Sequence, residues 1–134
     1  MLLHHFFDLT NERVPDKVAL ICDGKRYTYA ELDARIAQLA SVLRRRGVKH
    51  GDRVALFLDN SFEMAVCVFA ALQIGAVFMP VNALTKHDKL AFMLNDARAS
   101  ALMTHDALRG IWQHALAANK IGRASCRERV WCLV

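Results

Sequence analysis

The longest apolar run of the sequence, residues 64–81, limits the folds that are open to the chain. A membrane-spanning helix needs about 20 consecutive apolar residues. Gln73, Gly75 and Pro80 interrupt this run, and Gly and Pro commonly end a helix and a strand respectively. The pattern therefore predicts a buried helix that ends before Gly75, then a buried strand that stops at Pro80, and no transmembrane segment.

A β-hairpin is predicted near the amino terminus. Residues 18–22 and 25–28 are two short β-prone segments separated by Asp23-Gly24. This dipeptide tolerates the positive φ angles of a two-residue turn, so it predicts antiparallel strands over these two ranges.

A helix is expected directly after the hairpin. Thr28 stands three residues before Glu31, the spacing of a capping box in which each side chain bonds to the backbone of the other residue. The helix is expected to end at Arg46, with Gly47 in the left-handed conformation that often follows a helix. Apolar residues at helical spacing form its predicted inward face: Leu32, Ile36, Leu39, Ala40 and Leu43.

Strand-like and helix-like segments alternate along the rest of the chain. Asn60 with Glu63, then Thr85, then Asp106 are predicted to begin three further helices. The expected strands are 53–58, 76–79 and 99–104, and the expected helices are 62–74, 86–95 and 108–118. This order predicts the α/β class, with a mostly parallel sheet flanked by helices and preceded by the hairpin.

Composition narrows the classes of partner and compartment. The formal net charge is +5, and the run Arg44-Arg45-Arg46 is explained by the favourable placement of cations at a helix carboxyl terminus, so no nucleic-acid partner is predicted. The four cysteines have neither zinc-site spacing nor the pattern of a disulfide framework. The amino terminus lacks the features of a signal peptide. We therefore expect a cytoplasmic protein.

The carboxyl-terminal segment differs from the rest of the chain. Residues 120–130 resemble the in-frame translation of a sequencing-library adapter, and apolar residues there follow no helical period. We therefore expect residues 1–119 to be the natural part of the chain. Residues 120–134 are expected to be a non-native tail that does not dock on the core.

Three ordered segments carry a family resemblance: residues 27–32 (YTYAEL), 51–55 (GDRVA) and 72–82 (LQIGAVFMPVN). Together they resemble the first blocks of the acyl-adenylate-forming, or AMP-binding, superfamily. This superfamily includes acyl-CoA synthetases, luciferases and the adenylation domains of non-ribosomal peptide synthetases. The resemblance covers roughly residues 5–108 and implies that residues 1–119 are the amino-terminal part of such a domain.

The third segment points to one branch of this superfamily. Pro80-Val81-Asn82 is similar to the acyl-CoA synthetase version, whereas peptide-synthetase adenylation domains usually have Asp after the second apolar residue. Ala83 departs from the Pro that many synthetases have at this point. The resemblance implies a fragment of an AMP-forming acyl-CoA synthetase, and a peptide-synthetase adenylation domain is the alternative.

For a full-length enzyme the resemblance implies two steps. A carboxylic acid attacks the α-phosphate of Mg-ATP to give an acyl-adenylate and pyrophosphate, and a thioester then forms with coenzyme A. The Gly-rich phosphate loop, the ribose-binding acid and the carboxyl-terminal lysine of the family have no match in this sequence. The 134-residue chain is therefore expected to bind no cofactor and to have no ligase activity alone.

The sequence assigns no catalytic, cofactor-binding or metal-ligating residue. His87-Asp88 and His105-Asp106 could each pair a base with a carboxylate. Sequence neighbours seldom face each other, however, and Asp106 is already predicted to cap a helix.

Cys67 and the pair His4-His5 also have structural explanations. Cys67 lies among apolar neighbours at the centre of a predicted helix and is expected to be a small core residue. Adjacent histidines in a helix point to different faces, which does not favour a shared metal ion.

Two other classes of protein remain open: a complete non-catalytic α/β module that binds a partner, and an unrelated nucleotide-binding domain. The second lacks a phosphate loop after its first strand. The predicted helix 62–74 is apolar on nearly all sides, so a truncated domain would leave part of it uncovered. We therefore expect the isolated chain to self-associate or to form a molten globule.

Overall fold

The computed structural model describes residues 1–118, 125–128 and 131–133. Side chains are described as far as residue 118. Among the described residues, no helix has the length and apolar character needed to span a bilayer. The elements occur in this order: α1 (Leu3–Arg13), β1 (Val18–Cys22), β2 (Lys25–Thr28), α2 (Tyr29–Arg45), β3 (Arg53–Phe57), α3 (Phe62–Gln73), β4 (Val77–Val81), α4 (His87–Asp96), β5 (Ala101–Thr104), the short 3₁₀ helix η1 (Asp106–Leu108), α5 (Arg109–Ala118), β6 (Ser125–Glu128) and β7 (Trp131–Leu133).

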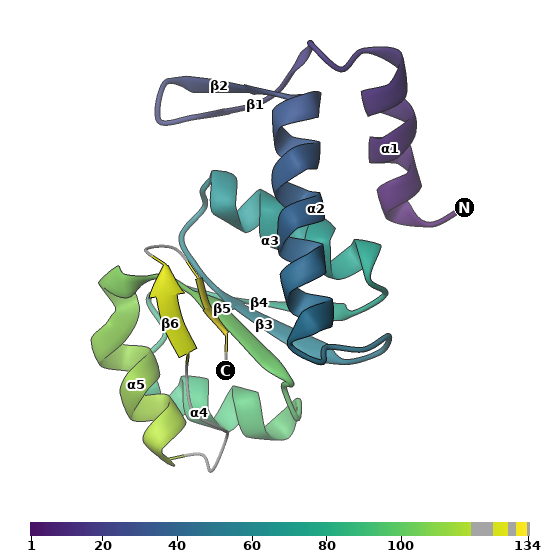
Figure 1. Cartoon of the computed structure of the whole chain (residues 1–134). Helices are drawn as coiled ribbons and strands as arrows, with labels where there is room; N and C mark the ends of the chain where they lie inside the picture. The colour runs from purple at the N-terminus through teal and green to yellow at the C-terminus, as the bar shows by residue number, and fades with distance from the viewer. Residues whose placement is uncertain (119–124, 129–130, 134) are drawn as a thin grey trace.

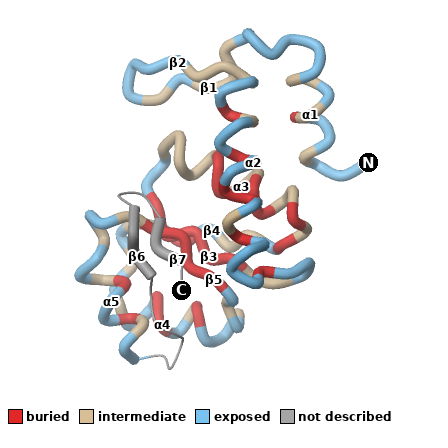
Figure 2. Tube along the Cα trace, viewed as in Figure 1, coloured by how far each residue is buried: buried red, intermediate tan, exposed pale blue. Residues whose placement is uncertain are grey.

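A parallel sheet with the order β4-β3-β5 lies at the centre of the molecule (Figure 1). Helices α1, α2 and α3 lie on one side of this sheet, and α4 and α5 lie on the other. Alternate residues of β3 enter two separate cores: Val54 and Leu56 pack towards α2 and α3, and Ala55 and Phe57 pack towards α4 and α5. The strands are the most deeply buried part of the trace (Figure 2). The predicted α/β class with a helix-flanked parallel sheet is confirmed.

The amino-terminal hairpin and the helix after it form as predicted. The two strands pair antiparallel around Asp23-Gly24. The Glu31 amide donates to Thr28 Oγ1 over 3.2 Å, and the Thr28 amide donates to Glu31 Oε2 over 2.9 Å, which completes the capping box. Helix α2 ends at Arg45, one residue before the predicted end. Its predicted inward face is buried at all five positions: Leu32, Ile36, Leu39, Ala40 and Leu43.

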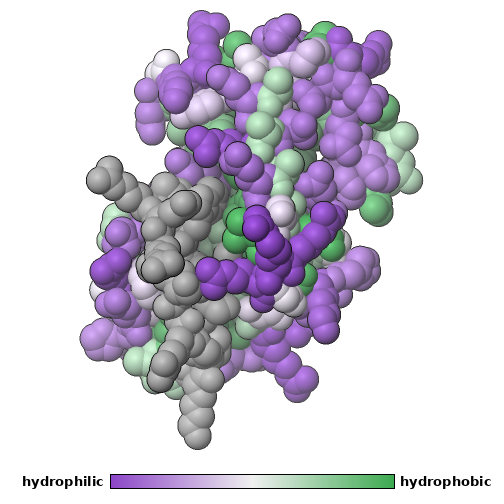
Figure 3. Space-filling view, in the orientation of Figure 1, coloured by the Kyte–Doolittle hydropathy of each residue, from purple (hydrophilic) through white to green (hydrophobic). Residues whose placement is uncertain are grey.

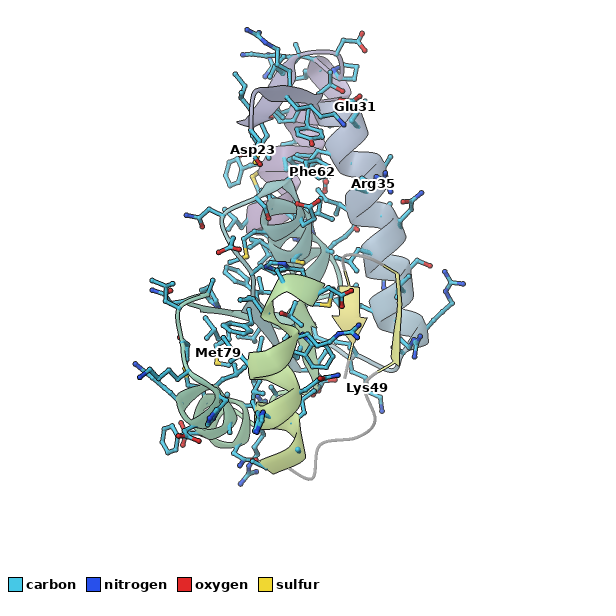
Figure 4. All side chains as sticks on the ribbon, turned by 90° about the vertical axis from the view of Figure 1, so that its left-hand side faces the viewer. Asp23, Glu31, Arg35, Lys49, Phe62 and Met79 are labelled. Carbon is cyan, nitrogen blue, oxygen red and sulfur yellow. The ribbon has the colours of Figure 1, made fainter. Side chains whose placement is uncertain are left out.

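Helix α1 is an element that the sequence analysis did not predict. Its Phe7 is buried, and the ring centroid of Phe7 lies 5.0 Å from that of Phe69 in α3. The hairpin reaches the same helix, because Tyr27 stacks on Phe62 with ring centroids 4.0 Å apart. Figure 4 labels Phe62 at the start of this helix. These contacts partly cover the side of α3 that does not face the sheet.

The expected amino-terminal cap of α3 is wrong. Its amino-terminal cap is Ser61, whose Oγ accepts a hydrogen bond from the Met64 amide over 3.2 Å, and the predicted pair Asn60 and Glu63 does not form the cap. The buried residues of α3 are Val66, Cys67, Ala70 and Ala71, and its other residues are half-buried, so the expectation that part of this helix stays uncovered remains a prediction. Sequence periodicity identified an apolar helix but could not show that α1 and the hairpin would contact it.

Strand β4 continues through Pro80, which was expected to stop it. β4 is an edge strand of the parallel sheet. The Val77 amide donates to the Asp52 carbonyl over 2.8 Å, so Val77 faces β3. Successive residues of a strand direct their backbone groups to opposite edges. Pro80 therefore faces away from β3, and its missing N–H removes no bond from the sheet.

The predicted caps of the last two helices are also wrong. Lys86 occupies the N-cap position of α4 without a side-chain cap, so Thr85 does not cap this helix. Asp106 lies inside η1, and its carboxylate accepts a hydrogen bond from Arg109 over 2.8 Å. Each helix start follows a turn whose conformation depends on packing. The presence of a capping residue type in the sequence alone could therefore not locate where either helix begins.

The carboxyl-terminal segment contains two short strands, β6 and β7, which pair antiparallel. β7 lies beside β5. The expectation that no part of residues 120–134 docks on the core is therefore wrong for β7. Residues 119–124, 129–130 and 134 lie outside the described residues.

Candidate functional site

Polar residues follow the carboxyl ends of all three parallel strands. Asp59 comes shortly after β3, Asn82 directly follows β4, and His105 directly follows β5. In open α/β sheets, ligands bind outside the carboxyl ends of the strands. This edge of the sheet is therefore the candidate functional site of the described residues.

His105 and Asp59 meet at the carboxyl ends of these strands. His105 Nε2 lies 3.3 Å from Asp59 Oδ2, at an angle that does not make a hydrogen bond. The His105 side chain is 24% exposed, whereas that of Asp59 is 68% exposed. A protonated His105 would form an ion pair with Asp59, and a neutral one could accept a proton at Nε2. The carboxylate partner of His105 is therefore Asp59, and not its sequence neighbour Asp106.

Asn82 has a structural role at the same edge. Its Oδ1 accepts a hydrogen bond from the Leu84 amide over 2.9 Å, and its carbonyl accepts one from the Thr85 amide over 2.9 Å. These bonds form the turn between β4 and α4. They leave the apolar side chain of Leu84 88% exposed at the tip of the turn.

Thr104, the last residue of β5, is fully buried, and its Oγ1 has no hydrogen-bond partner among the described residues. Its register partner is Phe57, on the side of the sheet that packs against α4 and α5. Trp112 of α5 is buried in the same core, and its Nε1 also lacks a partner. Within the part of the chain that the structure describes, Thr104 and Trp112 are therefore unsatisfied polar groups in the core under α5.

His87 and Asp88 contact each other, contrary to the expectation from their adjacent positions. His87 Nδ1 lies 3.0 Å from Asp88 Oδ1. The His87 ring also stacks on that of His114 in α5, with ring centroids 5.2 Å apart. The Asp88 side chain is 93% exposed, so this cluster lies on the outer surface of α4 and α5.

The structure confirms the assignment of Cys67 to the core. The side chain is buried in α3. Burial, and then the charge of Glu63, raise the pKa of the Cys67 thiol far above its usual range. The thiol therefore stays protonated near neutral pH and is not an activated nucleophile.

His4 and His5 contact each other edge to face with ring centroids 4.4 Å apart, instead of pointing apart as expected. His5 Nδ1 accepts a hydrogen bond from the Leu2 amide over 3.1 Å, so His5 helps to begin α1. In the part of the chain that the structure describes, no three His, Cys, Asp or Glu side chains come together to hold a metal ion.

The sequence analysis missed the pairing of Asp59 with His105. One signal was present, because Asp59 directly follows the predicted strand 53–58 and His105 directly follows the predicted strand 99–104. Carboxyl ends of parallel strands meet at one edge of a sheet. The missing fact was that β5 pairs with β3, which is a matter of strand order.

Curated relatives match most of this chain. It is 36% identical over 102 residues to bacitracin synthase 1 of Bacillus licheniformis, and this match covers 76% of this chain and 2% of the relative. It is 35% identical over 103 residues to tyrocidine synthase 2 of Brevibacillus parabrevis, which covers 77% of this chain and 3% of the relative. The chain thus spans only a small fraction of the length of the curated relatives it matches.

Solved structures match the fold closely. A benzoate CoA ligase from Burkholderia xenovorans LB400 has a TM-score of 0.85 at 28% identity, covering 90% of this chain and 25% of that chain. A putative long-chain-fatty-acid CoA ligase from Rhodopseudomonas palustris CGA009 has a TM-score of 0.83 at 34% identity, and the match covers 91% of this chain and 30% of that chain. The AMPPNP-bound non-ribosomal peptide synthetase FmoA3 has a TM-score of 0.77 at 31% identity, and the match covers 81% of this chain and 12% of that chain.

These matches agree on one fold and one kind of enzyme domain. The sheet and its helices are similar to the amino-terminal part of adenylate-forming enzymes. The model of the family described as AMP-binding enzyme matches residues 7–133. The chain belongs to this AMP-binding enzyme family.

Proposed function

We propose that this chain is the amino-terminal part of an ATP-dependent acid–thiol ligase that makes acyl-CoA. In the full-length protein, a carboxylate would attack the α-phosphate of ATP, forming an acyl-adenylate and releasing pyrophosphate. The thiolate of coenzyme A would then displace AMP to give the thioester. The observation that carries this proposal is the similarity to the putative CoA ligase, which combines 34% identity with a TM-score of 0.83 over 91% of this chain.

A peptide-synthetase adenylation domain is the second candidate. It is favoured by the curated relatives, because the two reported above are peptide synthases. Pro80-Val81-Asn82 favours the CoA branch on the resemblance described above. The two candidates share the adenylation step and differ in the thiol that accepts the acyl group.

Nothing among the described residues assigns a binding site for ATP, Mg²⁺ or coenzyme A. Mg²⁺ is usually held by one or two carboxylates together with substrate phosphates, and the described residues contain no group of three His, Cys, Asp or Glu side chains that could hold a metal ion by themselves. The glycines that precede β3 and β4 lie in single tight turns, Gly51 and Gly75, and not in a phosphate-binding loop. We therefore derive no step through these groups from this chain. Its part in the proposed enzyme is the sheet and the helices that support the rest of the domain.

Two further points belong to this proposal. Residues 1–119 would form the natural domain part and residues 120–134 a non-native tail, although the family match extends to residue 133. The enzyme would work in the cytoplasm, where Cys22 and Cys67, both free thiols, would remain reduced.

The test uses the full-length protein encoded at the source locus. Carboxylate-dependent exchange of pyrophosphate into ATP, over a panel of fatty, aryl and amino acids, measures the adenylation step. Thioester formation is then compared with coenzyme A and with a phosphopantetheinylated carrier protein as acceptor. Acyl-CoA formation supports the proposal, and transfer only to the carrier protein supports the second candidate. Absence of exchange with every acid would contradict both, and the 134-residue chain is the expected inactive control.

A further inference from the structure

Basic side chains gather around the amino ends of the parallel strands, at the opposite end of the sheet from the candidate functional site. This basic end consists of the carboxyl end of α2, the turn before β3 and the turn before β5, with these residues: Arg44, Arg45, Arg46, Lys49, Arg53 and Arg98. They are six of the 14 Lys and Arg residues in positions 1–118, and only two acids, Asp52 and Asp96, lie in the same segments. In the rest of this range ten acids outnumber eight Lys and Arg residues, so the positive charge is concentrated at the basic end. Strongly hydrophilic side chains gather at the lower end of α2 in the space-filling view (Figure 3).

Two of these arginines join the segments of the basic end to one another. Arg53 Nε donates to the Ala97 carbonyl over 2.7 Å, and its guanidinium also donates to the Arg98 carbonyl over 3.4 Å. The Arg44 guanidinium donates to the Gln73 carbonyl, at the end of α3, over 3.4 Å. Cations are favourable at the carboxyl ends of helices. The ends of α3 and α4 therefore account for Arg44 and Arg53, but not for the other basic side chains.

Three further cations come from three separate segments of the basic end. Arg45 is the last residue of α2, Lys49 lies in the turn before β3, and Arg98 lies in the turn before β5. All three are exposed. Among the described residues, none of the three side chains makes a hydrogen bond or an ion pair. The nearby carboxylate of Asp52 accepts a hydrogen bond from the backbone amide of Lys49 over 2.8 Å. These cations are therefore available to an anionic partner.

The surroundings of these cations favour a broad anionic surface as the partner. Val77, which is 52% exposed, is the one strongly exposed large apolar side chain of the described residues at the basic end, whereas protein interfaces usually have an apolar centre. None of the described Phe, Tyr and Trp residues is exposed there, so no ring is available to stack on a nucleic-acid base. Attraction to a membrane surface needs neither feature, because it requires only Lys and Arg within the screening length of anionic head groups.

We propose that the basic end docks this protein on a membrane surface rich in anionic lipids, through Arg45, Lys49 and Arg98. The contact is electrostatic and is made with the lipid head groups. It turns the carboxyl ends of the strands, with His105 and Asp59, away from the membrane. This inference does not rest on the proposed ligase activity, because binding to lipid is measured without substrate.

Cosedimentation with lipid vesicles tests this proposal in the full 134-residue chain. Vesicles of equal amounts of phosphatidylcholine and phosphatidylglycerol should bind the chain, and pure phosphatidylcholine vesicles should not. Binding should weaken as salt is added, because the screening length becomes shorter. The triple variant Arg45→Glu, Lys49→Glu and Arg98→Glu should bind at least about 100-fold more weakly, because each basic residue near an anionic surface contributes roughly a factor of five.

A matched control changes the net charge by the same amount elsewhere. The variant Arg13→Glu, Lys17→Glu and Arg26→Glu reverses three exposed cations in α1, in β2 and between α1 and β1. It should bind less than about tenfold more weakly than the unmodified chain, because these charges lie away from the docked surface. Both variants keep residues 120–134, so any contribution of that segment is the same in each.

Four results would overturn the proposal. The first is the absence of any preference for the anionic vesicles, and the second is an equal loss of binding in the two variants, since net charge alone would then decide. The third is tighter binding to a DNA duplex than to the anionic vesicles at the same salt concentration. The fourth is the absence of vesicle binding by the full-length protein, because the rest of the domain would then cover the basic end.

Discussion

The imidazole of His50 packs directly against Gly75. A Cβ atom at Gly75 would overlap with His50 Cδ2 and would lie 3.2 Å from Cγ, and Gly75 has a φ angle of 73°. The Gly51 amide also donates to the Gly75 carbonyl over 2.8 Å. These contacts join the turn before β3 to the turn before β4, so the close approach depends on glycine at position 75.

Gly75→Ala is expected to lower the free energy of unfolding more than Gly47→Ala. Gly47 also has a positive φ angle, but a Cβ there meets no atom within 4 Å. The Gly47 change should cost roughly 1–2 kcal/mol for the left-handed conformation alone. Gly75→Ala adds the contact with His50, at about 1–3 kcal/mol. Urea unfolding measures both, and His50→Ala in the Gly75→Ala background should recover the added part. Equal costs for the two glycine changes would contradict this account.

Asp33→Asn is expected to stabilise the chain at neutral pH. Partial burial, and then the charge of Asp8, raise the pKa of the Asp33 carboxyl above its usual range. The folded state therefore holds this proton more tightly than the unfolded state does. The charged carboxylate therefore destabilises the folded state. This destabilisation is absent below the pKa of Asp33 in the unfolded state and is complete above its pKa in the folded state. Unfolding at pH 7 should show the variant as the more stable protein, and near pH 3 the two should converge. A constant difference at both pH values would refute the assignment.

Thr104→Val is expected to stabilise the chain by about 1 kcal/mol. The hydroxyl of Thr104 is buried without a hydrogen-bond partner, and burying such a group costs free energy. Valine removes the hydroxyl and keeps the shape of the side chain. Thr104→Ser is the matched control, because it keeps the hydroxyl and loses the methyl group, and it should destabilise the chain. Thermal unfolding compares the three proteins, and a loss of stability in the valine variant would show that the hydroxyl has a partner.

Self-association of the isolated chain is expected to involve α1. Leu2, Phe6 and Leu9 lie on one helical face and are 62%, 60% and 46% exposed. Apolar side chains reach the surface on the side of the molecule where α1 lies (Figure 3). Phe6→Lys combined with Leu9→Glu should reduce ANS binding and the sedimentation coefficient of any oligomer. Leu84→Glu removes one highly exposed apolar residue elsewhere and is the control. Equal effects of the two variants would exclude α1 as the contact surface.

The local elements followed from the sequence because their causes lie within a few residues. Asp23-Gly24 closes the hairpin, and Thr28 with Glu31 starts α2, through bonds between near neighbours. The apolar residues from Leu32 to Leu43 recur at helical spacing, so they predict one buried face of this helix wherever the helix lies in the fold. The three segments that carry the family resemblance lie in helices, strands and turns of the same α/β fold.

Tertiary structure decided the features that depend on strand order and on contacts between distant residues. Pro80 fits inside β4 only because β4 is an edge strand and its outward backbone groups need no partner there. Asp59 meets His105 because β3 lies beside β5. Helix α3 is partly covered from outside the sheet because Phe7 and Tyr27 reach it from separate segments. Periodicity and capping signals carry no information about such neighbours, since each contact joins residues that only the folded chain brings together.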